Sequence, residues 1–123
     1  MALAGFLQGY FQTLRWSATE KAQTILQRAI TLEEATRNDL VTELTTFYEN
    51  HRNAIESATG LVGLSRSIAW QAGHDLCFVR NGYRGFHASD WGTLIARRMR
   101  DDSDLLGKCE IDYRDGALTV VRV

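Results

Sequence analysis

The chain has 123 residues, of which 45% are hydrophobic and 24% charged, and it contains no proline. This profile is typical of one compact domain over residues 1–123 and disfavours a disordered or linker-rich chain. Fourteen Lys and Arg side chains stand against fifteen Asp and Glu. Such a balance disfavours a generally basic nucleic-acid binder and a heavily acidic DNA mimic.

The ends and the cysteines suggest a cytoplasmic protein. No stretch approaches the roughly 20 apolar residues of a membrane span, and the N-terminus lacks the basic region that opens a signal peptide. Cys77 and Cys109 form neither a CxxC motif nor a zinc-ligand set. We expect both as reduced core thiols, with a single disulfide as the alternative.

The first sixteen residues carry apolar side chains at steps of three and four, which predicts one helical face. These side chains are Leu3, Phe6, Leu7, Tyr10, Phe11 and Leu14. An aromatic stripe of this kind is more often core than a surface, and a docking stripe for a partner is the alternative. A short helix is also expected within residues 17–30.

A longer helix is predicted over about residues 32–57. Thr31 and Glu34 have the spacing of a capping box. Apolar and aromatic side chains keep helical spacing behind them, at Leu40, Val41, Leu44, Phe47, Tyr48, His51 and Ile55.

After this helix, the spacing of apolar residues becomes less regular and then changes from the helical to the strand period. The segment GLVGLSRSIAW predicts a short helix that ends at Gly73. DLCFVR, at residues 75–80, is compact, apolar and β-prone, and Asn81-Gly82 after it is a strong hairpin signal. The return YRGFHA, with Gly85, supports at most a distorted or edge strand.

A further helix is expected after this hairpin, capped by Ser89 or Asp90. Its buried face is predicted to hold Trp91, Leu94, Ile95 and Met99. Leu105, Leu106 and Gly107 close it.

A second hairpin is predicted about Asp115-Gly116 at the C-terminus. A two-residue turn pairs Tyr113 with Leu118 and Ile111 with Val120, and both strands then agree on which face is apolar. The expected fold is therefore α+β: N-terminal helices followed by β-hairpin, helix and β-hairpin, forming a small antiparallel sheet.

The polar group most like a site comprises His74, Asp75, His87 and Asp90. A hairpin about Asn81-Gly82 would bring the two histidines together, but no HExxH or HxxxH spacing fixes metal ligands. Cys77 with a nearby histidine as base is a conceivable nucleophile, although a packed thiol is the favoured interpretation. We therefore expect no catalytic residue, no metal and no cofactor.

The charge is unevenly distributed along the chain. Residues 31–57 hold six acidic and two basic side chains, residues 80–100 hold five arginines and one aspartate, and residues 101–115 are again acidic. The simplest interpretation is a solvated surface with local pairs such as Arg97–Asp101 and Arg98–Asp102. The alternative is a bipolar surface for partner binding.

If the charges bind a partner, we expect the acidic helix to do so through Asp39, Glu43 and Glu49. Complementary charge speeds encounter with the basic grooves of host nucleic-acid machineries. Arg97, Arg98 and Arg100 form the alternative patch.

One segment carries a resemblance. GHDLCFVRNGYRGFHASDWG, at residues 73–92, is similar to a signature of small phage, prophage and plasmid proteins with a Gly-His-Asp strand followed by Arg-Asn-Gly. The ending CEIDYRDGALTVVRV fits the same layout. Cys77 departs from the pattern, standing where an aromatic is common. No activity is assigned to that family, so no catalytic residue carries over.

The resemblance implies an accessory protein of a mobile element in a bacterial cytoplasm. The expected function is a non-enzymatic inhibitor of a host protein, with a defence system such as a CRISPR–Cas complex as the first target class. A small nucleic-acid-associated protein that uses the arginines at 80–100 is the alternative.

Overall fold

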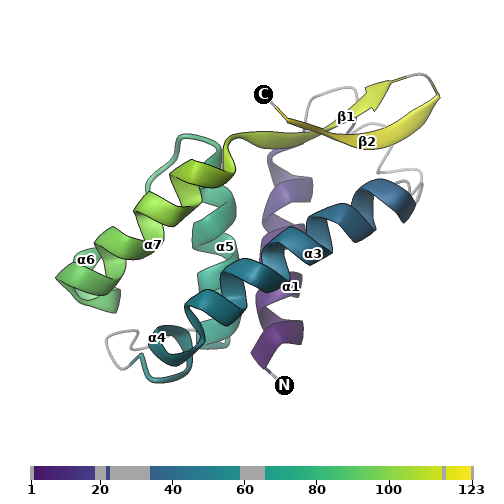
Figure 1. Ribbon diagram of the computed structural model, residues 1–123. Helices are drawn as coiled ribbons and strands as arrows, with labels where there is room; N and C mark the ends of the chain where they lie inside the picture. Colours follow the sequence, from purple (N-terminus) through teal and green to yellow (C-terminus); the bar gives the residue numbers. More distant parts are fainter. Residues whose placement is uncertain (1, 19–21, 23–33, 59–65, 115, 123) are drawn as a thin grey trace.

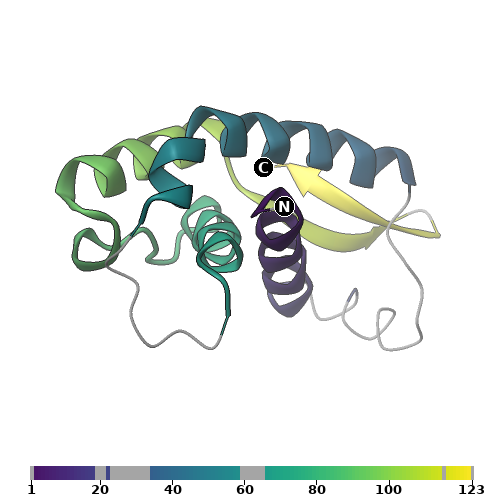
Figure 2. The ribbon, with the colours of Figure 1, turned by 90° about the horizontal axis from the view of Figure 1, so that it is seen from below.

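The computed structural model describes residues 2–18, 22, 34–58, 66–114 and 116–122. Its helices are α1 (Ala2–Trp16), α3 (Glu34–Asn50), α4 (Arg52–Glu56), α5 (Ile68–Arg80), α6 (Ala88–Trp91) and α7 (Thr93–Leu106). Strands β1 (Cys109–Arg114) and β2 (Ala117–Arg122) follow them. Helices α1 and α5 lie side by side, and α3, α4, α7 and the hairpin cover them (Figures 1 and 2). The α+β class is confirmed.

The core forms where these layers meet. Side chains from α1, α3, α5 and α7 and from both strands meet there. The largest of those that are fully buried are Phe6, Tyr10, Leu14, Leu40, Leu44, Tyr48, Ile55, Leu76, Phe86, Met99, Ile111 and Leu118. Phe6, Tyr10 and Leu14 of the N-terminal stripe are therefore core, as predicted, whereas Leu3, Leu7 and Phe11 are half-buried against it.

The closest packing joins α1 to α5 through two glycines. A Cβ built on Gly9 would lie 2.0 Å from the carbonyl oxygen of Trp70, and one on Gly73 would lie 2.0 Å from that of Phe6. The two backbones thus touch at the crossing, which only residues without a side chain allow. Gly73 lies inside α5, so the prediction that it ends a helix is wrong.

The predicted strand at 75–80 is also wrong, because these residues complete α5. The buried side of this helix includes Ala69, Ala72, Gly73 and Arg80. Because these residues are small or charged, the apolar residues of the segment do not recur at helical spacing in the sequence. A short apolar run does not by itself distinguish helix from strand.

Asn81-Gly82 ends α5 instead of turning a hairpin. Gly82 has φ +85°, its N–H donates to the Val79 carbonyl, and the Tyr83 N–H donates to the Phe78 carbonyl. This is the Schellman arrangement that closes a helix. The predicted return strand YRGFHA is an irregular segment leading to α6.

Asp75 holds that irregular segment in place from inside α5. Its carboxylate accepts from the Phe86 backbone N–H and from the Trp91 indole, both at 3.2 Å, and from Gln71 at 2.8 Å. Phe86 is buried with φ +52°, and this bond supports its unusual backbone.

The long acidic helix is divided at His51. The ring of His51 is buried, packs 4.5 Å from the centre of the Phe47 ring, and lies 2.7 Å from Asp102 of α7. This contact accompanies the break between α3 and α4. The predicted capping box at Thr31 and the short helix expected within 17–30 fall largely outside the described residues.

The helical segment after the irregular loop, α6 and α7, differs from the prediction in its cap and in its buried face. His87 precedes α6 and Gly92 precedes α7, so neither Ser89 nor Asp90 is the cap. Ala96, Met99 and Ser103 form the buried side of α7. Leu94 and Ile95, predicted to be buried, are exposed, and the end at Leu106 and Gly107 is confirmed.

The C-terminal hairpin has the predicted register, with Tyr113 opposite Leu118 and Ile111 opposite Val120. Ile111 and Leu118 are buried, whereas Tyr113 and Val120 are half-buried against the core. This hairpin is the whole sheet among the described residues, so the hairpin predicted about Asn81-Gly82 is absent from it.

The helix crossing predicts how alanine substitutions at the glycines behave. Gly73→Ala and Gly9→Ala should each lower the free energy of unfolding by about 3 kcal/mol, because backbone atoms cannot yield to a new methyl group. Urea unfolding followed by circular dichroism measures the change.

Gly5→Ala is the matched control, since its Cβ would lie 3.1 Å from the Ser67 hydroxyl and at ordinary contact distances, 3.7 and 3.9 Å, from Ala69 Cβ and the Trp70 nitrogen. It should change stability by less than about 1 kcal/mol, as alanine is also the better helix former. A stabilised Gly73→Ala variant would contradict the close crossing.

Candidate functional site

An open aromatic groove of about 340 Å³ runs between α1 and α5 on the surface. Its lining comprises Gln12, Thr13 and Trp16 from α1 and Trp70, His74 and Phe78 from α5. We call these six residues the aromatic groove.

The spacing of α5 creates this surface. Trp70, His74 and Phe78 recur every four residues, so their rings lie in one row on the outer side of the helix. The Trp70 and His74 rings are stacked, with centroids 5.3 Å apart, and those of His74 and Phe78 are 4.2 Å apart. Because sequence reasoning ended a helix at Gly73, it missed this row.

Further side chains extend the row at both ends. The Arg66 guanidinium lies 4.9 Å from the centre of the Trp70 ring, a cation–π arrangement. At the other end, the ring centroids of Trp16 and Tyr83 lie 5.9 and 5.4 Å from that of Phe78. Trp16 is 66% exposed and Tyr83 is 55% exposed, which leaves large aromatic surfaces open to solvent.

Hydrogen bonds orient the polar members of the groove. The Thr13 hydroxyl donates to the Gly9 carbonyl at 2.8 Å and lies 2.8 Å from Nδ1 of His74. Nδ1 is therefore the donor to Thr13, and Nε2 is left as an acceptor. Gln12 accepts from the Trp70 indole at 3.1 Å.

Burial lowers the pKa of His74 below its ordinary value, and the nearby Asp75 carboxylate opposes that shift. The imidazole is thus neutral at pH 7. A neutral ring completes an apolar aromatic surface, whereas a protonated ring would place a charge in the middle of it.

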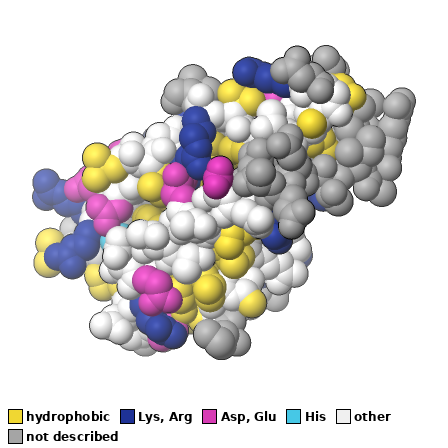
Figure 3. Space-filling view, turned by 45° about the vertical axis from the view of Figure 1, so that its right-hand side comes forward, with side chains coloured by type: hydrophobic (Ala, Val, Ile, Leu, Met, Phe, Trp, Pro, Cys, Tyr) yellow, Lys and Arg dark blue, Asp and Glu magenta, His cyan; other side chains and the backbone are white. Residues whose placement is uncertain are grey.

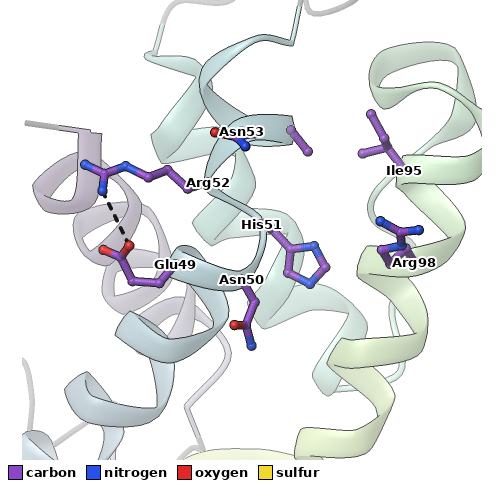
Figure 4. A pocket seen from close by; sticks show the side chains of 8 residues that line it. Glu49, Asn50, His51, Arg52, Asn53, Ile95 and Arg98 are labelled. Atoms are coloured by element: carbon purple, nitrogen blue, oxygen red, sulfur yellow. Dashed lines mark hydrogen bonds and ion pairs between the residues drawn. The ribbon is translucent and has the colours of Figure 1, made fainter.

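A second hollow, between α4 and α7, is polar (Figure 4). It is lined by Glu49, Asn50, His51, Arg52, Asn53, Ala54, Ile95 and Arg98. Arg52 pairs with Glu49 at 3.4 Å and with Glu56 at 3.3 Å, and His51 pairs with Asp102. The charged groups of this hollow largely satisfy one another, so we favour the aromatic groove as the candidate site.

The His and Asp cluster expected from the sequence does not assemble. His74 faces the groove, Asp75 faces the core, and His87 is exposed at the start of α6. In the part of the chain that the structure describes, no three His, Cys, Asp or Glu side chains gather in a way that could hold a metal ion.

The charges expected to bind a partner are only partly free. Glu43 pairs with buried Arg80 at 2.7 Å and with Arg122 at 2.8 Å. Asp39 and Glu49 remain exposed on α3. Among the described residues, the predicted pairs Arg97–Asp101 and Arg98–Asp102 do not form.

The alternative arginine patch is also reduced. Arg80 is inside the fold, and Arg100 donates to the Phe86 carbonyl at 2.9 Å. Arg84, Arg97 and Arg98 are exposed. On the face drawn in Figure 3, basic and acidic side chains lie next to each other instead of forming separate patches.

Both cysteines are buried free thiols, as expected, and no disulfide joins them. Burial raises the pKa of Cys77 to about 12. The thiolate that nucleophilic chemistry requires is therefore scarce at neutral pH.

The chain matches no protein-family model, no curated protein and no solved structure with which it was compared. No described helix has the length and apolar character needed to cross a membrane.

Thiol reactivity tests the buried cysteines. At about pH 8, neither Cys77 nor Cys109 should react with Ellman's reagent in the native protein, because both sulfurs are buried and the raised pKa of Cys77 also disfavours its thiolate. Both should react once the chain is unfolded in guanidinium. Rapid native reaction at Cys77 would contradict its position in the core.

The lowered pKa of His74 gives a pH prediction with a definite sign. Below about pH 6.5 the unfolded chain binds a proton at this position that the folded chain resists, so stability falls as the pH decreases from about 7 to 5. His74→Gln should remove this part of the pH dependence. The measurement is the difference in unfolding free energy between wild type and variant across that range, in which the other histidines cancel. A difference that does not change with pH would contradict the prediction.

Proposed function

We propose that the chain is a non-enzymatic protein of a phage or mobile element that binds and inhibits a host protein through the aromatic groove. The observation that carries this proposal is the row of stacked rings left open on the outer side of α5. The mobile-element context comes from the resemblance of residues 73–92, and a bacterial defence system such as a CRISPR–Cas complex is the first target class.

The residue types of the groove support a protein partner. Tryptophan, tyrosine and arginine are the side chains that most often dominate binding energy at protein interfaces. Trp16, Trp70, Tyr83 and Arg66 bring all three types together at one surface. Because Trp70 is already stacked and hydrogen-bonded in the free protein, little side-chain entropy is lost when a partner binds.

The charge beside the groove favours a particular kind of partner. The Arg66 guanidinium lies over the Trp70 ring at one end and gives that end a positive charge. A host surface that inserts an apolar side chain between the rings and places carboxylates around it matches this arrangement.

The acidic side of α3, proposed from the sequence, is less suited to this role. Glu43 is already bound to Arg80 and Arg122, and Glu49 pairs with Arg52, so among the described residues only Asp39 of the original three stands outside an ion pair. Nucleic-acid binding through residues 80–100 is weakened in the same way, as Arg80 and Arg100 have partners within the fold.

Affinity purification from a bacterial lysate, with mass spectrometry, identifies the partner. Binding to the purified partner is then compared for three variants. Trp16→Ala/Trp70→Ala should weaken binding by at least about 30-fold, since the two side chains form the aromatic anchor. Asp39→Lys/Glu49→Lys and Arg97→Glu/Arg98→Glu should each change it less than about threefold.

Circular dichroism and thermal unfolding establish that each variant is folded. The partner's own activity should fall when wild-type protein is added and should be preserved with the groove variant. Equal binding by the groove variant, or recovery of partners that nuclease treatment abolishes, would overturn the proposal. The second result would favour nucleic-acid binding.

A further inference from the structure

A second exposed stripe lies on α7, away from the aromatic groove. It consists of Leu94, Arg98, Asp101 and Leu105, which we call the α7 stripe. Leu94 is 79% exposed and Leu105 is 84% exposed, so two leucines face solvent on one helix of 14 residues.

Helical geometry places these four side chains in a narrow row. At 100° per residue they fall within an arc of about 60°. The buried residues Ala96, Met99 and Ser103 lie on the opposite side of the helix. The α7 stripe therefore lies on the side of α7 opposite these buried residues, with Arg98 at the edge that borders the polar hollow.

The order of the residues along the stripe is self-complementary. Leu94 and Leu105 lie equally far from the midpoint between Arg98 and Asp101. A second α7 placed antiparallel about a twofold axis through that midpoint brings each Leu94 against a Leu105 and each Arg98 against an Asp101. Such an isologous contact uses the same patch on both copies.

The charged members of the stripe are available for this pairing. In the described part of the chain, neither Arg98 nor Asp101 takes part in an ion pair. Figure 4 shows the Arg98 side chain on the side of α7 that borders the polar hollow. A reversed arrangement of the second copy would oppose like charges, so the charges specify the antiparallel register.

We propose that the α7 stripe is a homodimer interface in which two copies of this chain pair antiparallel through α7. Two leucine pairs supply the apolar contact, and two Arg98–Asp101 pairs set the register. An interface limited to one helix face is small, and the dimer is accordingly a reversible one.

Sedimentation equilibrium over about 5 to 200 µM, a range suited to a small interface, tests the proposal. Wild-type protein should approach twice the monomer mass as concentration rises. Arg98→Asp or Asp101→Arg alone should raise the dissociation constant at least about tenfold, because either one opposes like charges twice in a symmetric dimer. Leu94→Ser/Leu105→Ser should have the same effect through the lost apolar contact.

Mixing the two charge variants gives the decisive result. When the Arg98→Asp chain meets the Asp101→Arg chain, every opposed pair again has unlike charges. A heterodimer should form although each variant alone is monomeric. Arg15→Asp and Asp39→Arg are matched controls that change the net charge equally on other helices, and both should dimerise like wild type.

Wild-type protein that remains monomeric at 200 µM would overturn the proposal. The proposal would also be overturned if none of the α7 variants weakened dimerisation, or if mixing the two charge variants failed to restore it. Loss of helical circular dichroism in a single variant does not account for restoration in the mixture, which keeps the test independent of folding defects. The result is also independent of the aromatic groove, whose residues are unchanged in these variants.

Discussion

The buried guanidinium of Arg80 is the interaction on which the arrangement of the other elements depends. An unpaired charge inside a protein costs several kcal/mol, so its partners must come into place when the chain folds. Arg80 donates to the Gly107 and Leu106 carbonyls at the end of α7 and to the Tyr10 hydroxyl, at 2.8, 3.2 and 3.0 Å.

Glu43 supplies the countercharge from α3 and also pairs with Arg122 on β2. The Tyr10 hydroxyl in turn lies 3.0 Å from the sulfur of Cys109 on β1. One side chain of α5 thereby positions α1, α3, α7 and the hairpin. Because Arg80 and Glu43 pair with each other inside the fold, neither is available to the separate basic and acidic surfaces that the sequence suggested for partner binding.

The inner and outer sides of α5 have separate roles. Toward the core, Gly73 allows α1 to approach, Asp75 holds the following loop, and Arg80 gathers the remaining elements. The inward-facing residues between Gly73 and Arg80 thus hold the fold together. The outer side of the same helix carries Trp70, His74 and Phe78, whose stacked rings are half-buried and line the aromatic groove.

The sequence by itself determined the elements whose signals are local and agree with each other. Alternation in both strands sets the C-terminal register, since a slip of one residue would expose the apolar face. Helical spacing identifies α1 and most of α3. Tertiary structure decided α5, because its buried side includes Ala, Gly, Asp and Arg beside Leu76 and Cys77, and the burial of these small and charged residues depends on backbones and charges distant in sequence. It therefore also decided the aromatic groove, which exists only because residues 68–80 are one uninterrupted helix lying against α1.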